Sequence, residues 1–489
     1  MNSTNYQTTK AEPDASSMIE TFRAIGYSME TAIADIMDNS ISAGAKNIWL
    51  NYDWKGENTI IRIKDDGYGM NGEELIQAMR PGSRHPLEER SSKDLGRFGL
   101  GLKTASFSQT RKFSVLSKKE GYNPVYWAWD LDHVNKVSSW ELIQYIPSSD
   151  LFPEIESMNS GTSVIWYCLD RTLKGTVSDD KEAMGKFMEI MEKVKFHLEM
   201  VFHRFIEQGK IIIWVQDRKV EAWDPFLKGK KGLQISSEEF FGDNMVNVKG
   251  YVLPHKSKLT EQEFKRAAGP KGWNEQQGFY IYRNQRLLVA GDWLGMFQKE
   301  EHNKLCRILI DLPNTIDDKW QIDIKKSVAR PPIKVRSQLK AYAKSTRSNA
   351  VEVYRYKGKV LKRKYKSTFI PVWQDEKRRG KLCYKINREH PVISSLTDNP
   401  TKVELNRLLH LLEETVPISS ITIKEALDKE NYITPFENIG HNQLKEMISE
   451  MVTQLTLQGK SLEDATSIIL TIEPFDQYPE YVCKLIDHI

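Results

Sequence analysis

The sequence predicts an α+β fold, in which a sheet carries helices on one face. The first observation is helical spacing near the N-terminus, where Met18, Phe22 and Ile25 recur on one face. The second is a pair of strand-like runs, 47–54 and 59–66, that follow the next helical segment and are joined by the turn KGEN. Helices and strands mixed in this order are typical of an α+β sandwich.

Composition excludes several classes of protein. The 489 residues, 40% hydrophobic and 28% charged, suit about three globular domains. The four cysteines lie far apart, which argues against a zinc ribbon or a disulfide framework and favours a reducing compartment. No apolar run is long enough to span a bilayer, and the N-terminus is polar. We therefore expect a soluble, cytoplasmic protein that does not associate with a membrane.

A first domain is expected over residues 16–178, after a flexible N-terminus, 1–15. Ser28 suits the N-cap of its second helix, and Gly44 suits the end of that helix. The segment 81–101 carries glycines and charges with little apolar periodicity, as expected of a mobile lid. The other predicted elements of this domain are a helix at 73–80 and strands at 112–118, 124–131 and 161–169.

A second domain is expected over 179–335, and a third region over 336–489. The second begins with the longest helical pattern, 181–208, and contains a hairpin, 278–288, that turns at Arg283-Asn284-Gln285. Its other strands are predicted at 211–226 and 306–312. The third region mixes strands and helices, with strand-like pieces at 369–373 and 382–386 and helices at 402–415, 441–458 and 462–470.

Asp35 and Asn39 are one helical turn apart, so they share a face of the second helix. An amide oxygen can ligate Mg²⁺, and a carboxylate can orient or deprotonate an attacking water. The alternative is an ordinary solvated helix face, which is common for polar residues at this spacing.

Two glycine-containing turns follow. In DDGYGM, 65–70, a carboxylate at the end of a strand can accept a hydrogen bond from an exocyclic amine such as that of adenine; the alternative is an ordinary Asp-Gly turn. In GRFGLGLKT, 96–104, successive backbone N–H groups before a helix can bind an anion, and Lys103 can add a charge. The order of residues matches neither a Rossmann turn nor a Walker P-loop.

The three motifs together resemble the Bergerat-fold ATPases, the GHKL superfamily of gyrase, heat-shock chaperones, MutL and MORC proteins. The resemblance implies a Bergerat ATP-binding domain with ATP and Mg²⁺ as cofactors. It implies Asp35 as general base, Asn39 as magnesium ligand and Asp65 as the adenine-reading carboxylate. The other nucleotide-binding residues that it implies are Gly67, Gly69, Met70, Gly96, Arg97, Phe98, Gly99, Leu100, Gly101, Leu102, Lys103 and Thr162.

Two further features sharpen this expectation. The usual base of the superfamily is glutamate, and Asp35 is one methylene shorter, so we expect slow hydrolysis. The segments 278–288 and 320–332 resemble the ribosomal-protein-like transducer domain of MORC-like proteins, in which a lysine reaches the γ-phosphate. Lys325 or Lys326 is the match, and the alternative is a surface Lys-Lys pair.

The segment 334–366 is strongly basic, with Glu352 as its one acidic residue. Its cations, interleaved with Tyr342, Tyr354, Tyr356 and Tyr365, predict sequence-independent DNA binding. The alternative is a solvated helix paired with acidic residues such as Glu413 and Glu414.

The function that the resemblance implies is a MORC-like ATPase that dimerises on binding ATP and acts as a nucleotide-gated clamp on DNA. A partner nuclease or helicase and a bacterial restriction or anti-phage system are the expected setting. The alternatives are an ATP-driven chaperone or scaffold without DNA binding and a MutL-like repair factor. A histidine kinase is disfavoured, because no histidine precedes the first motif.

Overall fold

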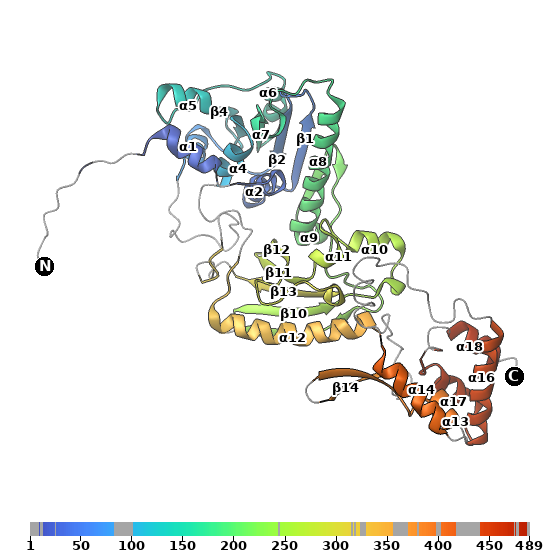
Figure 1. The fold of residues 1–489 in the computed structure, drawn as a ribbon. Coiled ribbons are helices and arrows are strands. Elements are labelled where there is room, and N and C mark those ends of the chain that lie inside the picture. Colours follow the sequence, from blue (N-terminus) through green and yellow to red (C-terminus); the bar gives the residue numbers. More distant parts are fainter. Residues whose placement is uncertain are drawn as a thin grey trace, which may run out of the picture. The chain divides into compact units, whose positions relative to one another are not determined.

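A computed structural model describes most of the chain. The described residues are 9, 13–24, 26–82, 101–242, 245–313, 316, 319–322, 329–355, 370–378, 381–397, 402–416, 441–473, 475 and 479–486. They form two compact units, Met1–Lys359 and Val360–Ile489 (Figure 1). Within these residues, no helix is both long enough and apolar enough to cross a membrane.

A seven-stranded sheet organises the N-terminal part of the first unit, in the order β4-β3-β5-β2-β1-β6-β7. Its strands are β1 (Asn47–Asp53), β2 (Ile60–Asp65), β3 (Lys112–Lys118), β4 (Val125–Asp130), β5 (Gly161–Tyr167), β6 (Ile212–Val215) and β7 (Arg218–Lys219). All neighbours are antiparallel except β1 and β6, which pair in parallel. The sheet therefore continues beyond residue 178, where the sequence predicts the end of the first domain.

Helices α1 (Ala15–Arg23), α2 (Met29–Ser42), α4 (Gly101–Gln109) and α8 (Lys181–Val201) pack together with this sheet in one core. The remaining helices here are α3 (Gly72–Met79), α5 (Leu131–Val137), α6 (Leu151–Glu156), α7 (Asp170–Leu173) and α9 (His203–Glu207). The expected caps of α2 are confirmed, because Ser28 accepts from the Thr31 N–H and Gly44 has φ +71°. The helix predicted at 181–208 is interrupted at Phe202, where φ −102° and ψ 10° leave helical geometry.

A second sheet has the order β12-β11-β13-β10-β8, with β9 pairing to β10. Its strands are β8 (Gln234–Ile235), β9 (Glu239–Phe241), β10 (Val246–Val252), β11 (Gly278–Arg283), β12 (Arg286–Asp292) and β13 (Cys306–Leu312). The hairpin turn predicted between β11 and β12 is confirmed, with φ +47° at Asn284 and +71° at Gln285.

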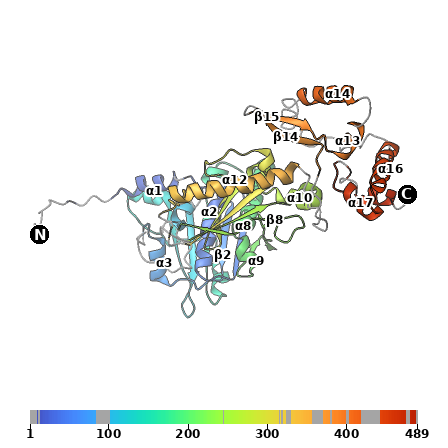
Figure 2. The ribbon, with the colours of Figure 1, turned by 90° about the horizontal axis from the view of Figure 1, so that it is seen from below.

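Both faces of the second sheet are covered. The long helix α12 (Ile333–Arg355) packs on one face with Val248, Ile281 and Ile308 (Figure 1; Figure 2). The other face carries Tyr280, Tyr282 and other residues of the core that α8 shares. Double coverage explains why every residue of β11 is buried. The short helices of this region are η1 (Lys256–Lys258), α10 (Glu261–Ala267), α11 (Gly272–Glu275) and η2 (Glu301–Asn303).

The second unit combines a hairpin with helices around its own core. Its elements are β14 (Trp373–Arg378), β15 (Lys381–Ile386), α13 (Pro391–Thr397), α14 (Lys402–Glu414), α16 (His441–Leu457), α17 (Leu462–Ile469) and α18 (Pro479–Ile486). The three predicted helices are confirmed. The strand predicted at 369–373 is wrong in its bounds, because pairing with β15 begins at Trp373 and continues to Arg378. Ile448, Ile469 and Val482 are among the fully buried core residues.

Candidate functional site

Asp65, at the end of β2, is the centre of a buried hydrogen-bonded cluster. Its Oδ2 accepts from the Ser40 hydroxyl at 2.7 Å, and its Oδ1 accepts from the Gly67 N–H at 2.9 Å. Burial raises the pKa of this carboxyl to about 6, although the two hydrogen bonds act in the opposite direction. The carboxylate is thus oriented by neutral donors, and each oxygen retains a lone pair that can accept from a ligand.

Thr162 and Met70 join the same cluster through Ser117 of β3. The Thr162 and Ser117 hydroxyl oxygens are 2.8 Å apart, and the Met70 N–H donates to Ser117 Oγ at 2.9 Å. Thr162 is also the strand partner of Asp65, since β5 pairs with β2 in that register. The structure therefore brings Asp65, Met70 and Thr162 together, as the sequence predicts.

Gly67 and Gly69 are required by contacts of the protein with itself. A Cβ at Gly69, where φ is +63°, would lie 1.8 Å from the Lys118 carbonyl oxygen. A Cβ at Gly67 would lie 2.8 Å from the Ala43 carbonyl oxygen. The two glycines thus let the turn after β2 pass between the end of α2 and β3, which fixes the position of Asp65.

Asp66 has a different role from its neighbour. Its carboxylate accepts from the backbone N–H groups of Lys46 and Asn47, at 2.7 and 2.8 Å, and from the Asn47 side chain at 2.8 Å. These bonds secure the start of β1. Of the acidic pair, Asp65 alone faces the cluster formed with α2.

Asp35 and Asn39 differ sharply in environment, although they lie one turn apart on α2. Asn39 is exposed, and its side-chain amide makes no hydrogen bond within the described residues. Asp35 is buried, and its Oδ2 accepts from the Tyr27 hydroxyl at 2.9 Å. An exposed amide without a partner suits a metal ligand, whereas a buried carboxylate must be held by nearby donors.

Arg286, the first residue of β12, supplies a charged donor to this part of α2. Its Nε donates to both carboxylate oxygens of Asp38, at 3.0 and 2.9 Å, and its Nη2 lies 3.4 Å from Asp35 Oδ1. Burial alone would lower the pKa of Arg286, but the charges of Asp38 and Asp35 raise it. Through Arg286 the second sheet thus contacts Asp35, the predicted general base. The side chains of Arg286, Asp35 and Asp38 are all buried in this charged cluster.

The predicted phosphate-binding residues are described only in part. Gly101 and Leu102 begin α4, and Lys103 is buried, with its Nζ donating to the Ala78 carbonyl at 2.9 Å. This bond attaches a cation near the C-terminal end of α3, where the helix dipole favours positive charge. Gly96, Arg97, Phe98, Gly99 and Leu100, and both transducer lysines, Lys325 and Lys326, lie outside the described residues.

One group of side chains in the described part of the chain has the composition of a metal site: His203, Glu207 and Asp224. Both ring nitrogens of His203 already have partners, Glu207 at 3.1 Å and the Tyr282 hydroxyl at 2.8 Å. Asp224 accepts from the Phe226 and Lys228 N–H groups. These bonds account for the group as a structural network between α9 and the second sheet.

Sequence reasoning missed four residues of the candidate site: Tyr27, Ser40, Ser117 and Arg286. Ser40 follows Asn39 directly, so a search of the residues beside each motif would have found it. Ser117 belongs to a predicted strand that is adjacent to none of the motifs, so only the strand pairing brings it to the site. Arg286 has no local signal, because its partners lie about 250 positions earlier in the chain.

Comparison with known proteins agrees with this geometry. Residues 27–162 match the family of histidine kinase-, DNA gyrase B- and HSP90-like ATPases. ATPase morc-1 of Caenorhabditis elegans is 31% identical over 91 residues, which are 19% of this chain and 10% of that protein. DNA mismatch repair protein MutL of Rickettsia akari is 30% identical over 97 residues, 20% of this chain and 16% of that protein.

The matches to curated relatives cover short parts of long proteins. Chaperone protein HtpG of Rickettsia canadensis, 34% identical over 105 residues, is likewise matched over 16% of its length and 19% of this chain. Among solved structures, the N-terminal domain of a DNA repair protein has a TM-score of 0.42 at 16% identity, over 70% of this chain and 99% of that one. Residues 27–162 thus match the ATPase family named above, and the predicted superfamily and α+β class are confirmed.

Proposed function

We propose that this domain binds ATP with Mg²⁺ and hydrolyses it slowly, and that nucleotide binding drives formation of a dimeric clamp on DNA. One observation carries the nucleotide part of the proposal. Asp65, Ser40, Gly67 and Thr162 converge beside α2. The same helix presents the exposed amide of Asn39, which has no hydrogen bond to any described residue, one residue before Ser40.

Each described residue has a role that its environment supports. Asp65 accepts a hydrogen bond from the exocyclic amine of adenine, because its carboxylate is oriented and its oxygens retain lone pairs. Asn39 contributes a hard oxygen ligand, and the Mg²⁺ that it helps to hold neutralises charge on the phosphates. The N–H groups that begin α4 face the negative phosphates, together with Lys103 if its bond to Ala78 is released.

Hydrolysis requires Asp35 to accept a proton. Water attacks the γ-phosphorus, the bond to the β,γ-bridging oxygen breaks to leave ADP, and the proton of the water passes to the Asp35 carboxylate. In the described state this carboxylate already accepts from Tyr27 and lies beside Arg286. We infer that Arg286 is a positioning residue, and that movement of the second sheet changes how strongly it holds Asp35. This coupling is the proposed cause of the slow turnover that we expect.

The DNA part of the proposal depends on a narrower set of residues than the sequence suggests. Tyr342 is not available to nucleic acid, because it is buried and its hydroxyl bonds the Gly250 N–H and the Ser237 carbonyl. Arg347 pairs with Glu300 at 2.6 Å, and Tyr354 packs against the core of the second sheet. Residues 356–369, with Tyr356 and Tyr365, lie outside the described part of the chain. The proposal therefore uses the exposed cations of α12, among them Lys334 and Lys340.

The proposed setting is a bacterial restriction or anti-phage system, in which DNA held by the clamp is acted on by a partner nuclease or helicase. An ATP-driven chaperone or scaffold is the competing function, and retention on duplex DNA that weakens with salt separates the two. A MutL-like repair factor would share the ATP site and the dimer.

The experiment that tests the proposal measures phosphate release with and without duplex DNA, together with the mass of the protein in a non-hydrolysable ATP analogue. Asp35→Asn is expected to retain ATP binding, to lose turnover by about 10²-fold or more, and to accumulate as a dimer. Asp53→Asn, an exposed carboxylate at the end of β1, is the matched control for charge. Equal phosphate release from Asp35→Asn and the wild type would reject Asp35 as the base.

A further inference from the structure

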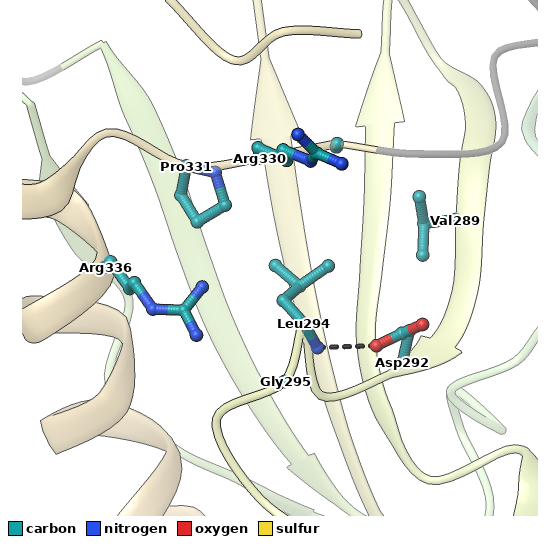
Figure 3. Close-up of a pocket in the computed structure, with 8 residues that line it drawn as sticks. Val289, Asp292, Leu294, Gly295, Arg330, Pro331 and Arg336 are labelled. Atoms are coloured by element: carbon teal, nitrogen blue, oxygen red, sulfur yellow. Dashed lines mark hydrogen bonds between the residues drawn. The ribbon is translucent and has the colours of Figure 1, made fainter. Parts of the chain in front are cut away.

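We propose that a cavity of about 340 Å³ beside α12 binds a phosphate group of a nucleic acid strand, an inference that deepens and rests on the proposed DNA binding. The cavity lies between the end of β12, the loop after it and the start of α12 (Figure 3). Two arginines, Arg330 and Arg336, line it together with one carboxylate, Asp292.

Both arginines lack a side-chain partner among the residues that the structure describes. Arg330 and Arg336 are both exposed, and within the described residues neither guanidinium forms a hydrogen bond or an ion pair. Arg336 differs in this respect from Arg347 on the same helix, whose guanidinium has partners within the protein. Arg347 pairs with Glu300 at 2.6 Å, and its guanidinium lies 4.2 Å from the centre of the Phe297 ring. Two unpaired guanidinium groups on one cavity are suited to bind a phosphate through several charge-assisted hydrogen bonds.

The other residues that line the cavity leave it with a net positive charge, which favours an anionic ligand. Val289, Leu294 and Pro331 are apolar, and Asp292 uses a carboxylate oxygen to accept from the Leu294 N–H at 2.5 Å (Figure 3). Among the described lining residues there are therefore two positive charges and one negative charge, and the negative charge already has a backbone partner. The first turn of the 23-residue helix α12 borders the same space and adds a favourable potential for an anion.

A row of cations continues from the cavity along α12. Arg336, Lys340 and Lys344 follow one another at intervals of four residues, so they form one stripe with a rise of about 6 Å from each cation to the next. All three are exposed, and none has an ion pair within the described residues. Like charges at this spacing destabilise a helix, and no ion pair with a described residue offsets that repulsion. A linear polyanion is the ligand that neutralises both the stripe and the cavity, which favours nucleic acid over a single carboxylate.

The cavity is on the opposite face of the second sheet from the candidate nucleotide site. Val289 belongs to the core that α12 covers, with Val335 and Leu339. Arg286, on the same strand, faces α2 and pairs with Asp38. Variants of the cavity can therefore be made without touching the residues assigned to ATP.

The test measures binding of a fluorescein-labelled 20-base-pair duplex, and of a single strand of the same length, to the full chain over a range of salt. We expect Arg330→Gln and Arg336→Gln each to weaken binding at least about fivefold and to reduce the slope of log K against log salt by about 0.9, as loss of one phosphate contact requires. Arg171→Gln removes an exposed arginine on α7 that also has no ion pair with any described residue, and is expected to leave the slope unchanged. ATP hydrolysis without DNA is expected to be unchanged in all three.

A fourth variant gives an effect of opposite sign. Asp292→Asn removes the negative charge of Asp292 from the cavity but retains an oxygen for the Leu294 N–H, so it is expected to strengthen DNA binding. The inference is overturned if the cavity variants behave as Arg171→Gln does while the wild type binds DNA. It is also overturned if they lose binding only to a labelled poly-glutamate peptide, which would make the cavity a carboxylate site. A wild type that binds neither nucleic acid would reject this site and the proposed clamp together, while leaving the ATPase result intact.

Discussion

The two ends of the candidate nucleotide site are built in different ways. At the adenine end, Asp65 is held by a hydroxyl and a backbone N–H from its own domain, and the register of β2 with β5 sets Thr162 beside it. At the phosphate end, Asp35 and Asp38 are held by Arg286, which lies 251 and 248 positions later and belongs to another sheet. We infer that the position of Asp65, the proposed adenine-reading carboxylate, is fixed by its own domain, whereas the position of Asp35, the proposed general base, also depends on the second sheet.

The largest expected effect tests how rigid the adenine end is. In Gly69→Ala the new Cβ would lie 1.8 Å from the Lys118 carbonyl oxygen, and φ is +63°, so the backbone must move. We expect a loss of more than about 4 kcal/mol in the free energy of unfolding, measured by chemical denaturation. Gly121→Ala is the control, because φ there is +79° but no atom lies within 4 Å of the added Cβ. The two variants should differ by about 2 kcal/mol or more, and equal losses would contradict the close packing of the turn.

The second effect tests the link at the phosphate end. Arg286→Met removes the guanidinium that bonds Asp38 and lies beside Asp35 in this buried cluster, so we expect a loss of about 3 kcal/mol in the free energy of unfolding. Adding Asp38→Asn should recover part of that loss, with a coupling of about 1 kcal/mol or more in a double-mutant cycle. Strictly additive losses would show that the ion pair does not link the two sheets.

The smallest effect concerns selection of the base and its dependence on pH. Burial raises the pKa of Asp65 to about 6, so its carboxylate is charged at pH 8 and mostly neutral at pH 5. A charged carboxylate accepts from the adenine amine and repels the guanine carbonyl oxygen, whereas a neutral carboxyl can donate to guanine. The ratio of ATP affinity to GTP affinity should therefore fall about tenfold between pH 8 and pH 5.

The ratio is the useful quantity, since the triphosphates of ATP and GTP titrate alike and their titration cancels. Competition binding measured at each pH gives it directly. In Asp65→Asn the ratio should not vary with pH. A ratio that varies equally in the variant and the wild type would exclude Asp65 as the group that reads the base.

The contrast between local and long-range contacts also explains which features of the fold and site could be predicted from the sequence. The motifs around Asp35, Asp65 and Gly101, the Ser28 cap and the turn at Asn284 were all predictable, because each is a local pattern of residue types. The parallel pairing of β6 with β1 and the reach of Arg286 to α2 were not, because they depend on contacts between distant segments. For Tyr342 the local pattern gave a wrong prediction. Its basic neighbours in the sequence indicate a surface residue, but its position on α12 places its side chain in the core formed with the second sheet.

The most direct test of the central claim is calorimetric titration of ATP, with and without Mg²⁺, into the wild type and Asn39→Ala. Because Asn39 is exposed and its side chain has no hydrogen bond within the described residues, the substitution should change the free energy of unfolding by less than about 0.5 kcal/mol. We expect the wild type to bind ATP in the presence of Mg²⁺ and the stably folded variant to lose that metal-dependent binding. Unchanged affinity in Asn39→Ala would contradict the assignment of one Mg·ATP site to α2 and the turn after β2.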